Sequence, residues 1–204
     1  MIFFHPFKTQ NNMKQCPSFK GQRLFPVFLK KIINDKTQLK IPAYFTKIDS
    51  SDKSLMMEVC DVWEPSCYGE MICKGYFRKE HGYSFAQDYE YFMIETNAAI
   101  NKEKSVKAIA EVIPENRKIE LNFLQSRSEF ETKETIKGGA TMLLYGLCEY
   151  AKRIKAKSIE LYSDNERSDK LYKELGFDEI TESLFVLPAK NYNKFIKNIK
   201  EKFF

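Results

Sequence analysis

The first half of the chain alternates apolar and polar residues in short runs, a pattern that predicts half-buried β-strands. Four such runs lie at 41–48, 91–96, 106–113 and 118–125. The turn-forming run 114–117 separates the last two, so these strands should pair as an antiparallel hairpin. Along the last strand the alternation places Ile119, Leu121 and Phe123 on one face and Glu120, Asn122 and Leu124 on the other.

Helical features also occur in the first half. Apolar residues at helical spacing follow the capping run 50–52, which predicts a helix there. The run 24–33 predicts another short helix. The stretch 63–78 is aromatic and irregular, and its pattern favours neither helix nor strand.

From residue 140 the apolar residues recur every three or four positions and predict a helix over 140–155. A strand follows at 158–163. Together with the strand at 118–125, this helix and strand make a β-α-β unit, whose two strands most simply lie parallel. Ligands bind at the carboxyl ends of such strands, where the loop before the helix begins.

The rest of the chain continues the helical and strand patterns. A short helix should start at a cap supplied by Asp164 or Asn165 and stop at Gly176, which tolerates left-handed backbone. A late strand is expected at 184–187. A terminal helix would place Tyr192, Phe195, Ile196 and Ile199 on one face.

Length and composition fit one globular domain. The 204 residues are 43% hydrophobic and 30% charged, which argues against a disordered chain. No internal repeat or low-complexity linker divides them. We therefore expect an N-terminal arm or extra elements of uncertain order at 1–40, a main domain at 41–189 and a basic C-terminal helix at 190–204.

The charge pattern argues against a dedicated nucleic-acid or membrane binder. The formal net charge of +5 is a small excess, and basic and acidic residues are interspersed. The lysines of 190–204 could bind nucleic acid or a membrane, but a solvated terminal helix is the simpler interpretation. We expect neither partner, and we expect this tail to be dispensable for chemistry.

The cysteines predict neither a metal site nor a disulfide framework. Cys60, Cys67 and Cys73, taken with His81, match no common zinc spacing, and reduced thiols in a cytoplasm are expected. No apolar run approaches the ~20 residues that span a bilayer, and the start of the chain lacks signal-peptide features. A cytoplasmic location is therefore expected.

The loop before the predicted helix at 140–155 carries the clearest chemistry. Its residues are Thr135, Ile136, Lys137, Gly138, Gly139, Ala140 and Thr141. Two glycines and an alanine leave backbone N–H groups uncovered at a helix start, where the helix dipole is positive, and Lys137 adds a full charge. The loop therefore predicts a cradle for a pyrophosphate, although it has neither the P-loop nor the Rossmann pattern.

With the segments that follow it, this loop resembles the GNAT family of acetyl-CoA-dependent N-acetyltransferases. The family's loop reads R/Q-x-x-G-x-G/A, and Gly138 and Ala140 match its last two fixed positions. The family's later N…LY-x-x-x-GF segment matches from Asn165 to Phe177. The resemblance covers about 118–177.

The loop departs from the family's pattern in two ways. Thr135 stands where the family has Arg or Gln, which places one phosphate contact in question. The run 126–134 is longer than usual and carries three glutamates, which would repel a pyrophosphate unless they point away or pair with basic side chains.

The resemblance implies an α/β class GNAT fold: a mixed, mostly antiparallel sheet with a central parallel β-α-β unit splayed to bind acetyl-CoA, and helices on both faces. It also implies direct transfer of acetyl from acetyl-CoA, a co-substrate, to a primary amine on a small cationic molecule or a peptide, without a metal. The coenzyme would contact Leu124, Gln125, Thr135, Ile136, Lys137, Gly138, Gly139, Ala140, Thr141, Asn165 and Tyr172.

Two side chains would carry the chemistry. An alkyl ammonium, with a pKa of about 10.4, must lose a proton before it can attack. The resemblance assigns that proton to Glu120; Glu111, Glu95 or a water molecule are the alternatives. Tyr172 matches the family's tyrosine that protonates the departing thiolate.

The sequence leaves a second class of function open, a GNAT-like module that binds acetyl-CoA without catalysis as a sensor or scaffold. Aromatic residues interleaved with glutamates at 63–83 predict the wall beside which a cationic acceptor amine binds. The identity of that amine and the oligomeric state, monomer or homodimer, stay open.

Overall fold

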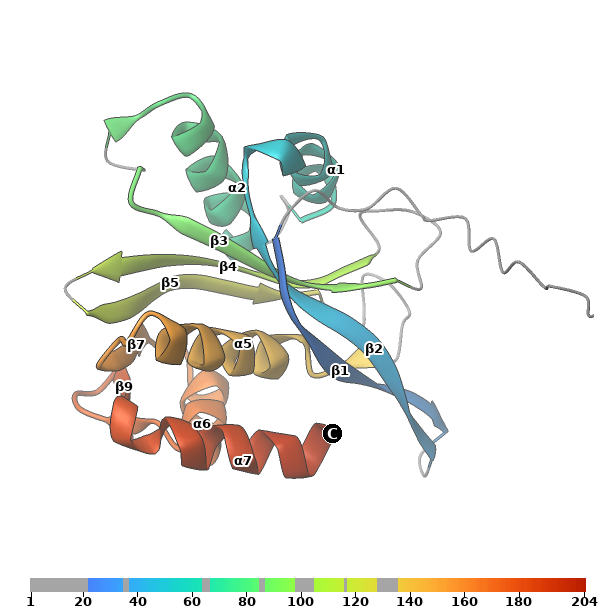
Figure 1. The fold of residues 1–204 in the computed structure, drawn as a ribbon, viewed down its shortest axis with the longest axis vertical. Coiled ribbons are helices and arrows are strands. Elements are labelled where there is room, and N and C mark those ends of the chain that lie inside the picture. Colours follow the sequence, from blue (N-terminus) through green and yellow to red (C-terminus); the bar gives the residue numbers. More distant parts are fainter. Residues whose placement is uncertain are drawn as a thin grey trace, which may run out of the picture.

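The computed structural model describes residues 22–34, 37–63, 67–84, 87–97, 105–115, 117–127 and 136–204. One sheet of nine strands runs through them in the order β6-β1-β2-β3-β4-β5-β7-β9-β8 (Figure 1). The strands are β1 (Gln22–Asn34), β2 (Thr37–Ile48), β3 (Glu90–Thr96), β4 (Val106–Glu115), β5 (Lys118–Ser126), β6 (Ile136–Lys137), β7 (Ser158–Tyr162), β8 (Asp178–Glu179) and β9 (Leu184–Pro188).

Helices cover both faces of this sheet (Figure 1). One face carries η1 (Ser50–Asp52), α1 (Lys53–Trp63) and α2 (Cys67–Glu80); the other carries α5 (Gly139–Arg153), α6 (Glu166–Leu175), η3 (Ala189–Asn191) and α7 (Tyr192–Phe203). Each set of helices buries its own apolar cluster against the strands. The α/β class with helices on both faces is therefore confirmed.

The unit β5-α5-β7 confirms the predicted β-α-β arrangement. β5 and β7 pair in parallel from Lys118 and Ser158 to Leu121 and Leu161, and every other strand pair in the sheet is antiparallel. β4 and β5 form the predicted hairpin. The helix joining the parallel strands lies across one face, as a crossover connection requires.

The predicted helix over 24–33 is wrong, because this stretch is the strand β1. Val27 and Leu29 are both fully buried, which is the two-residue period of a strand that packs one face on a core. Pro26 is tolerated because its neighbour on one side is Tyr44 of β2, while β6 on the other side pairs only with Lys30 and Lys31. The described part of the expected N-terminal arm thus comprises β1 and the start of β2.

The predicted alternation along β5 is also wrong beyond Leu121. Glu111 of β4 lies opposite Phe123, and Val112 lies opposite Leu121, so Asn122 is an extra residue in a β-bulge. The bulge moves Phe123 to the face of α1 and α2, away from Leu121. Leu124 correspondingly packs on the opposite cluster, next to α5.

The C-terminal helix α7 is part of the main core. Its predicted apolar face is buried, with Tyr192, Phe195, Ile196 and Ile199 each at most 6% exposed. α7 runs antiparallel to α5: the Lys152 ammonium donates to the Asn193 side chain over 2.9 Å. At the other end the Tyr145 and Phe204 rings lie 5.4 Å apart. Because removing α7 would expose the α5 core, truncation should destabilise the fold. The expectation that this tail is dispensable for chemistry applies only to a chain that still folds without it, and it stays a prediction.

The stretch 63–78, which no sequence pattern resolved, contains the end of α1 and most of α2. A disulfide between Cys60 and Cys73, with a Cα–Cα distance of 5.7 Å, joins these two helices. The expectation that all cysteines are reduced is therefore wrong for this pair. Cys148 is a free, buried thiol in α5. Within the described ranges, no helix is both long and apolar enough to cross a bilayer.

Candidate active site

A cleft opens where the two parallel strands separate. The pairing of β5 with β7 stops at Leu121 and Leu161, while β5 continues beside β4 to Ser126. The cavity in this gap has a volume of about 890 Å³. Its walls come from the ends of β5 and β7 and from α6, and its floor reaches the start of α5. The cleft thus lies at the carboxyl ends of the parallel strands, where α/β sheets bind ligands.

The start of α5 forms one end of the cleft and needs both of its glycines. Gly138 is the N-cap, with φ 98°, and it provides no side-chain cap. A Cβ on Gly139 would lie 2.7 Å from the Lys107 carbonyl oxygen, so only glycine allows α5 to approach β4 so closely. The first backbone hydrogen bond of α5 runs from Met142 to Gly138, which leaves the preceding N–H groups to a ligand.

Basic side chains dominate the charged lining of this cleft. Among the described residues, Lys107, Arg127, Lys137 and Arg167 line it, together with one carboxylate, Asp164. They come from β4, the end of β5, the cradle loop and α6, so four separate segments converge on one cavity. Such a lining attracts a ligand with several phosphates.

Tyr172 of α6 lines the same cleft. Its side chain is 8% exposed and its ring packs against Phe177 and Phe185. Burial, with smaller contributions from the carboxylates of Asp164 and Asp169, raises the pKa of Tyr172 to about 12. Its hydroxyl therefore keeps its proton at neutral pH and can donate it to a stronger base.

Tyr68 of α2 reaches across the mouth of the cleft. Its hydroxyl donates a 2.6 Å hydrogen bond to Asp164, which lies between β7 and α6. Its ring lies 5.9 Å from the ring of Phe123 on β5. The side-chain oxygen of Asn165 accepts a hydrogen bond from the Ser168 N–H and so caps α6, while the Asn165 amide donates to Asp164.

A buried carboxylate stands directly behind the cleft. The amide of Asn122, which lines the cavity, donates to Glu111 over 3.2 Å, and the Tyr91 hydroxyl donates to the other oxygen over 2.9 Å. Glu111 is 2% exposed. Burial raises the pKa of Glu111, while the hydrogen bonds from Asn122 and Tyr91 oppose that rise. A Cβ on Gly75 would lie 2.0 Å from this carboxylate, so α2 closes over it.

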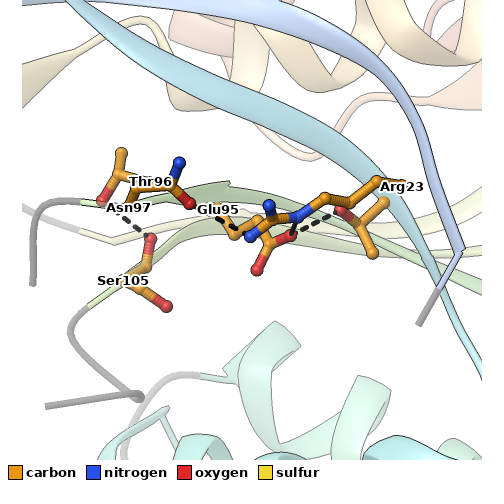
Figure 2. Close-up of polar contacts among 6 residues, drawn as sticks. Arg23, Glu95, Thr96, Asn97 and Ser105 are labelled. Carbon is orange, nitrogen blue, oxygen red and sulfur yellow. Dashed lines mark hydrogen bonds and ion pairs between the residues drawn. The ribbon is translucent and has the colours of Figure 1, made fainter. Parts of the chain in front are cut away.

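The other two candidate bases lie elsewhere. Glu120 is about one third exposed, does not line the cleft and shares the Lys118 ammonium with Glu160. Glu95 on β3 accepts hydrogen bonds from Arg23 over 2.8 Å and from Thr46 over 2.9 Å (Figure 2). Glu95 is also absent from the residues that line the cleft.

The structure brings most of the predicted coenzyme contacts together. Leu124, Gln125, Ile136, Lys137, Gly138, Gly139, Ala140, Asn165 and Tyr172 all line the one cleft. Thr141 lies in the first turn of α5 but not on the cavity wall, and Thr135 and the loop glutamates lie outside the described residues.

Sequence reasoning assigned no role to several residues of the cleft, among them Lys107, Arg127, Arg167 and Asn122. Lys107 had a usable signal, because it stands in a largely apolar strand, and Arg127 follows a predicted strand end directly. Asn122 had no such signal, because its position depends on the bulge. Tyr68 belongs to the predicted acceptor wall, but only the folded chain brings α2 beside β7.

The predicted acceptor wall at 63–83 is not one surface. Trp63 and Tyr76 are at most 2% exposed and fill the core beneath α1 and α2. Glu70 pairs with Lys74 on the helix surface. Among the residues of this segment that the structure describes, only Tyr68 reaches the cleft.

The sequence matches no protein-family model and no curated protein. Solved structures nevertheless share its fold. A GNAT-family acetyltransferase from Staphylococcus aureus has a TM-score of 0.51 and 12% identity over 72% of this chain and 99% of its own. Mutant forms of the spermidine/spermine N-acetyltransferase from Vibrio cholerae have a TM-score of 0.51 and 16% identity over 74% of this chain and 98% of theirs.

A third solved structure is the ribosomal-protein-S18-alanine N-acetyltransferase from Escherichia coli. It has a TM-score of 0.50 and 14% identity, over 72% of this chain and 94% of its own. The chain therefore has the GNAT fold, as the motifs in 118–177 predicted. At these identities the likeness defines the fold and leaves the reaction to the site.

Proposed function

We propose that this protein is an acetyl-CoA-dependent N-acetyltransferase that acetylates a primary amine. One observation carries the proposal: the gap between β5 and β7 is lined by the start of α5, whose N-cap provides no side-chain hydrogen bond, and by four basic residues. A cavity with this lining suits an anionic ligand, and Tyr172 and Asn122 line the same cavity. The GNAT fold of the chain supports the same assignment.

The residues of the cleft fit coenzyme A. The N–H groups at the start of α5, together with Lys137, would hold the pyrophosphate. Lys107, Arg127 and Arg167 would neutralise the remaining phosphate charge. Beyond Leu121 the inner edge of β5 is free of β7, so the backbone of Leu124 and Gln125 can pair with the pantetheine arm.

Bound acetyl-CoA would supply an acetyl thioester, whose C–S bond breaks as the amine nitrogen forms its bond to the carbonyl carbon. Tyr172 is the proposed proton donor to the departing sulfur, because its raised pKa keeps it protonated. Glu111 rather than Glu120 is the proposed proton acceptor; the hydrogen bond that Glu111 accepts from the cleft-lining Asn122 supports this choice. Positioning of the two substrates would provide much of the rate.

The acceptor is proposed to enter beside Tyr68, Asn122 and Phe123, on the α2 face of β5. A small cationic amine and the amine of a peptide both remain open. The spermidine/spermine and ribosomal-protein enzymes of the same fold act on one of each kind. The expected cytoplasmic location and the absence of a nucleic-acid or membrane partner stay predictions.

Calorimetric titration with coenzyme A, followed by a thiol-release screen with acetyl-CoA, tests this function. The screen should include polyamines, aminoglycosides and lysine or N-terminal peptides. Micromolar binding that weakens in Lys137→Gln, together with turnover on at least one amine, is the expected result; Lys190→Gln in η3 is the matched control. Binding without turnover on any amine would favour the alternative function, a coenzyme-binding sensor or scaffold, and no binding would reject both.

A further inference from the structure

We propose that Phe203, near the end of α7, is a positioning residue that shapes the phosphate cradle from outside the cleft. The inference rests on the proposed function, since it names a residue that would tune coenzyme affinity without touching the coenzyme. Phe203 is absent from the residues that line the cleft. It lies 65 positions after Gly138 in the sequence, so only the fold brings the two together.

The Phe203 ring fills the space beside the left-handed N-cap of α5. A Cβ built on Gly138 would lie 2.6 Å from Cε1 and 3.1 Å from Cζ of Phe203. Gly138 has φ 98°, a backbone conformation that glycine adopts readily. Because glycine can adopt many other conformations as well, the glycine alone does not fix this one. The ring therefore limits the backbone at the position from which the N–H groups of the cradle are oriented.

Phe203 is itself held from β1 and from its own helix, α7. The Lys30 ammonium of β1 lies 4.8 Å from the centre of its ring, in a cation–π contact. Lys30 is also the register partner of Lys137, so β1 touches both the ring and the cradle loop. Buried Ile199 ties the preceding turn of α7 to the core.

Fixing a binding loop before the ligand arrives improves affinity, because the ligand does not have to order the loop itself. Without the Phe203 ring, Gly138 would sample more conformations, and the N–H groups of Gly139 and Ala140 would converge less of the time. Coenzyme affinity should therefore fall, while the chemical step, which depends on the other end of the cleft, should not change.

The variant Phe203→Ala tests this role, with Phe204→Ala as the matched control on the same turn of helix. We expect Phe203→Ala to weaken coenzyme A binding about tenfold and to raise the KM for acetyl-CoA equally. The kcat and the KM for the acceptor should stay within twofold. Phe203→Leu, which still fills the space beside Gly138, should restore most of the affinity. Phe204→Ala should bind coenzyme as the wild type does.

Amide hydrogen exchange provides a readout that needs no ligand. The N–H groups of 139–141 should exchange faster in Phe203→Ala than in the wild type or in Phe204→Ala, at equal melting temperature. Faster exchange in a protein that binds no coenzyme would reject the proposed function and keep the positioning role. Unchanged exchange and unchanged affinity in folded Phe203→Ala, or the same loss of both in Phe204→Ala, would reject the positioning role.

Discussion

Asn122 donates a 3.2 Å hydrogen bond to Glu111 from the bulge of β5, and it does so at the point where β5 leaves β7. The extra residue turns the Asn122 amide toward the buried carboxylate of Glu111. It also leaves Phe123 on the face of the sheet that α1 and α2 cover. One side chain thus joins the cleft to a carboxylate whose pKa burial has raised. A raised pKa suits a group that must accept a proton from an ammonium.

The first prediction separates the two candidate bases. Glu111→Gln should reduce turnover by about a hundredfold or more near neutral pH, while coenzyme affinity stays the same, because Glu111 is remote from the cradle. Glu120→Gln, the matched control, should stay within a few fold, since Glu120 faces Lys118 rather than the cleft. Steady-state kinetics and calorimetry on both variants measure this.

The pH profile provides a second measure of the same assignment. In the wild type, kcat/KM should rise with pH until Glu111, with its raised pKa, and the acceptor amine have both lost their protons. In Glu111→Gln the part of the rise in kcat/KM that comes from deprotonation of the Glu111 carboxyl should disappear. If instead Glu120→Gln lost its activity and Glu111→Gln kept it, the base assignment would return to Glu120.

The second prediction concerns the leaving group. Tyr172→Phe keeps the ring packed on Phe177 and Phe185 and removes only the hydroxyl, so the melting temperature should change little. Turnover should fall about tenfold to a hundredfold. Acyl donors whose thiols have a lower pKa should lose less rate, because their thiolates need a proton less. An equal loss with every donor would contradict a proton-donating role for Tyr172.

The sequence predicted those helices and strands whose apolar spacing is unambiguous, because residues close together in the sequence determine them. The strand at 158–163, the helix that follows its cap Asn165 and the stop at Gly176 each depend on residues within one turn or strand. The cradle loop was found for the same reason, since its glycines, its lysine and its helix lie together in the sequence.

Features set by distant contacts could not be predicted in this way. The apolar residues of the run 24–33 have a spacing that fits either a helix or a strand, and only pairing with β2 selects the strand. The bulge at Asn122 depends on the register of β4 against β5. Likewise Tyr68 beside Asp164 and Phe203 beside Gly138 are brought together by packing between whole elements, which no local spacing encodes.

The third prediction tests the covalent link between α1 and α2. Cys60 and Cys73 are 13 positions apart. A disulfide that closes a loop of that length stabilises a fold by about 3 kcal/mol, because it lowers the conformational entropy of the unfolded chain. Reductant, or the double change Cys60→Ser with Cys73→Ser, should lower the free energy of unfolding by about that amount. Reductant should have no further effect on the double variant. Equal stability of the wild type with and without reductant would contradict a stabilising disulfide.

The last prediction concerns the buried Glu95, whose titration should make the stability of the fold depend on pH. Burial raises the pKa of Glu95, although Arg23 and Thr46 donate hydrogen bonds to it (Figure 2). A carboxyl with a raised pKa in the folded state binds its proton more tightly there than in the unfolded chain. Its contribution to stability is therefore complete below the unfolded pKa, about 4.3, and is lost as the pH rises through the folded value.

Glu95→Gln removes this titration and keeps an oxygen for Arg23 and Thr46. The stability of the wild type relative to Glu95→Gln should therefore fall as the pH rises above the unfolded pKa of about 4.3, and it should level off once Glu95 is ionised in the fold. Urea unfolding at several pH values measures the difference. Glu179→Gln, at a half-exposed surface ion pair with Lys173, is the control. A wild-type advantage that instead grew with pH would mean that Arg23 outweighs burial and holds Glu95 ionised.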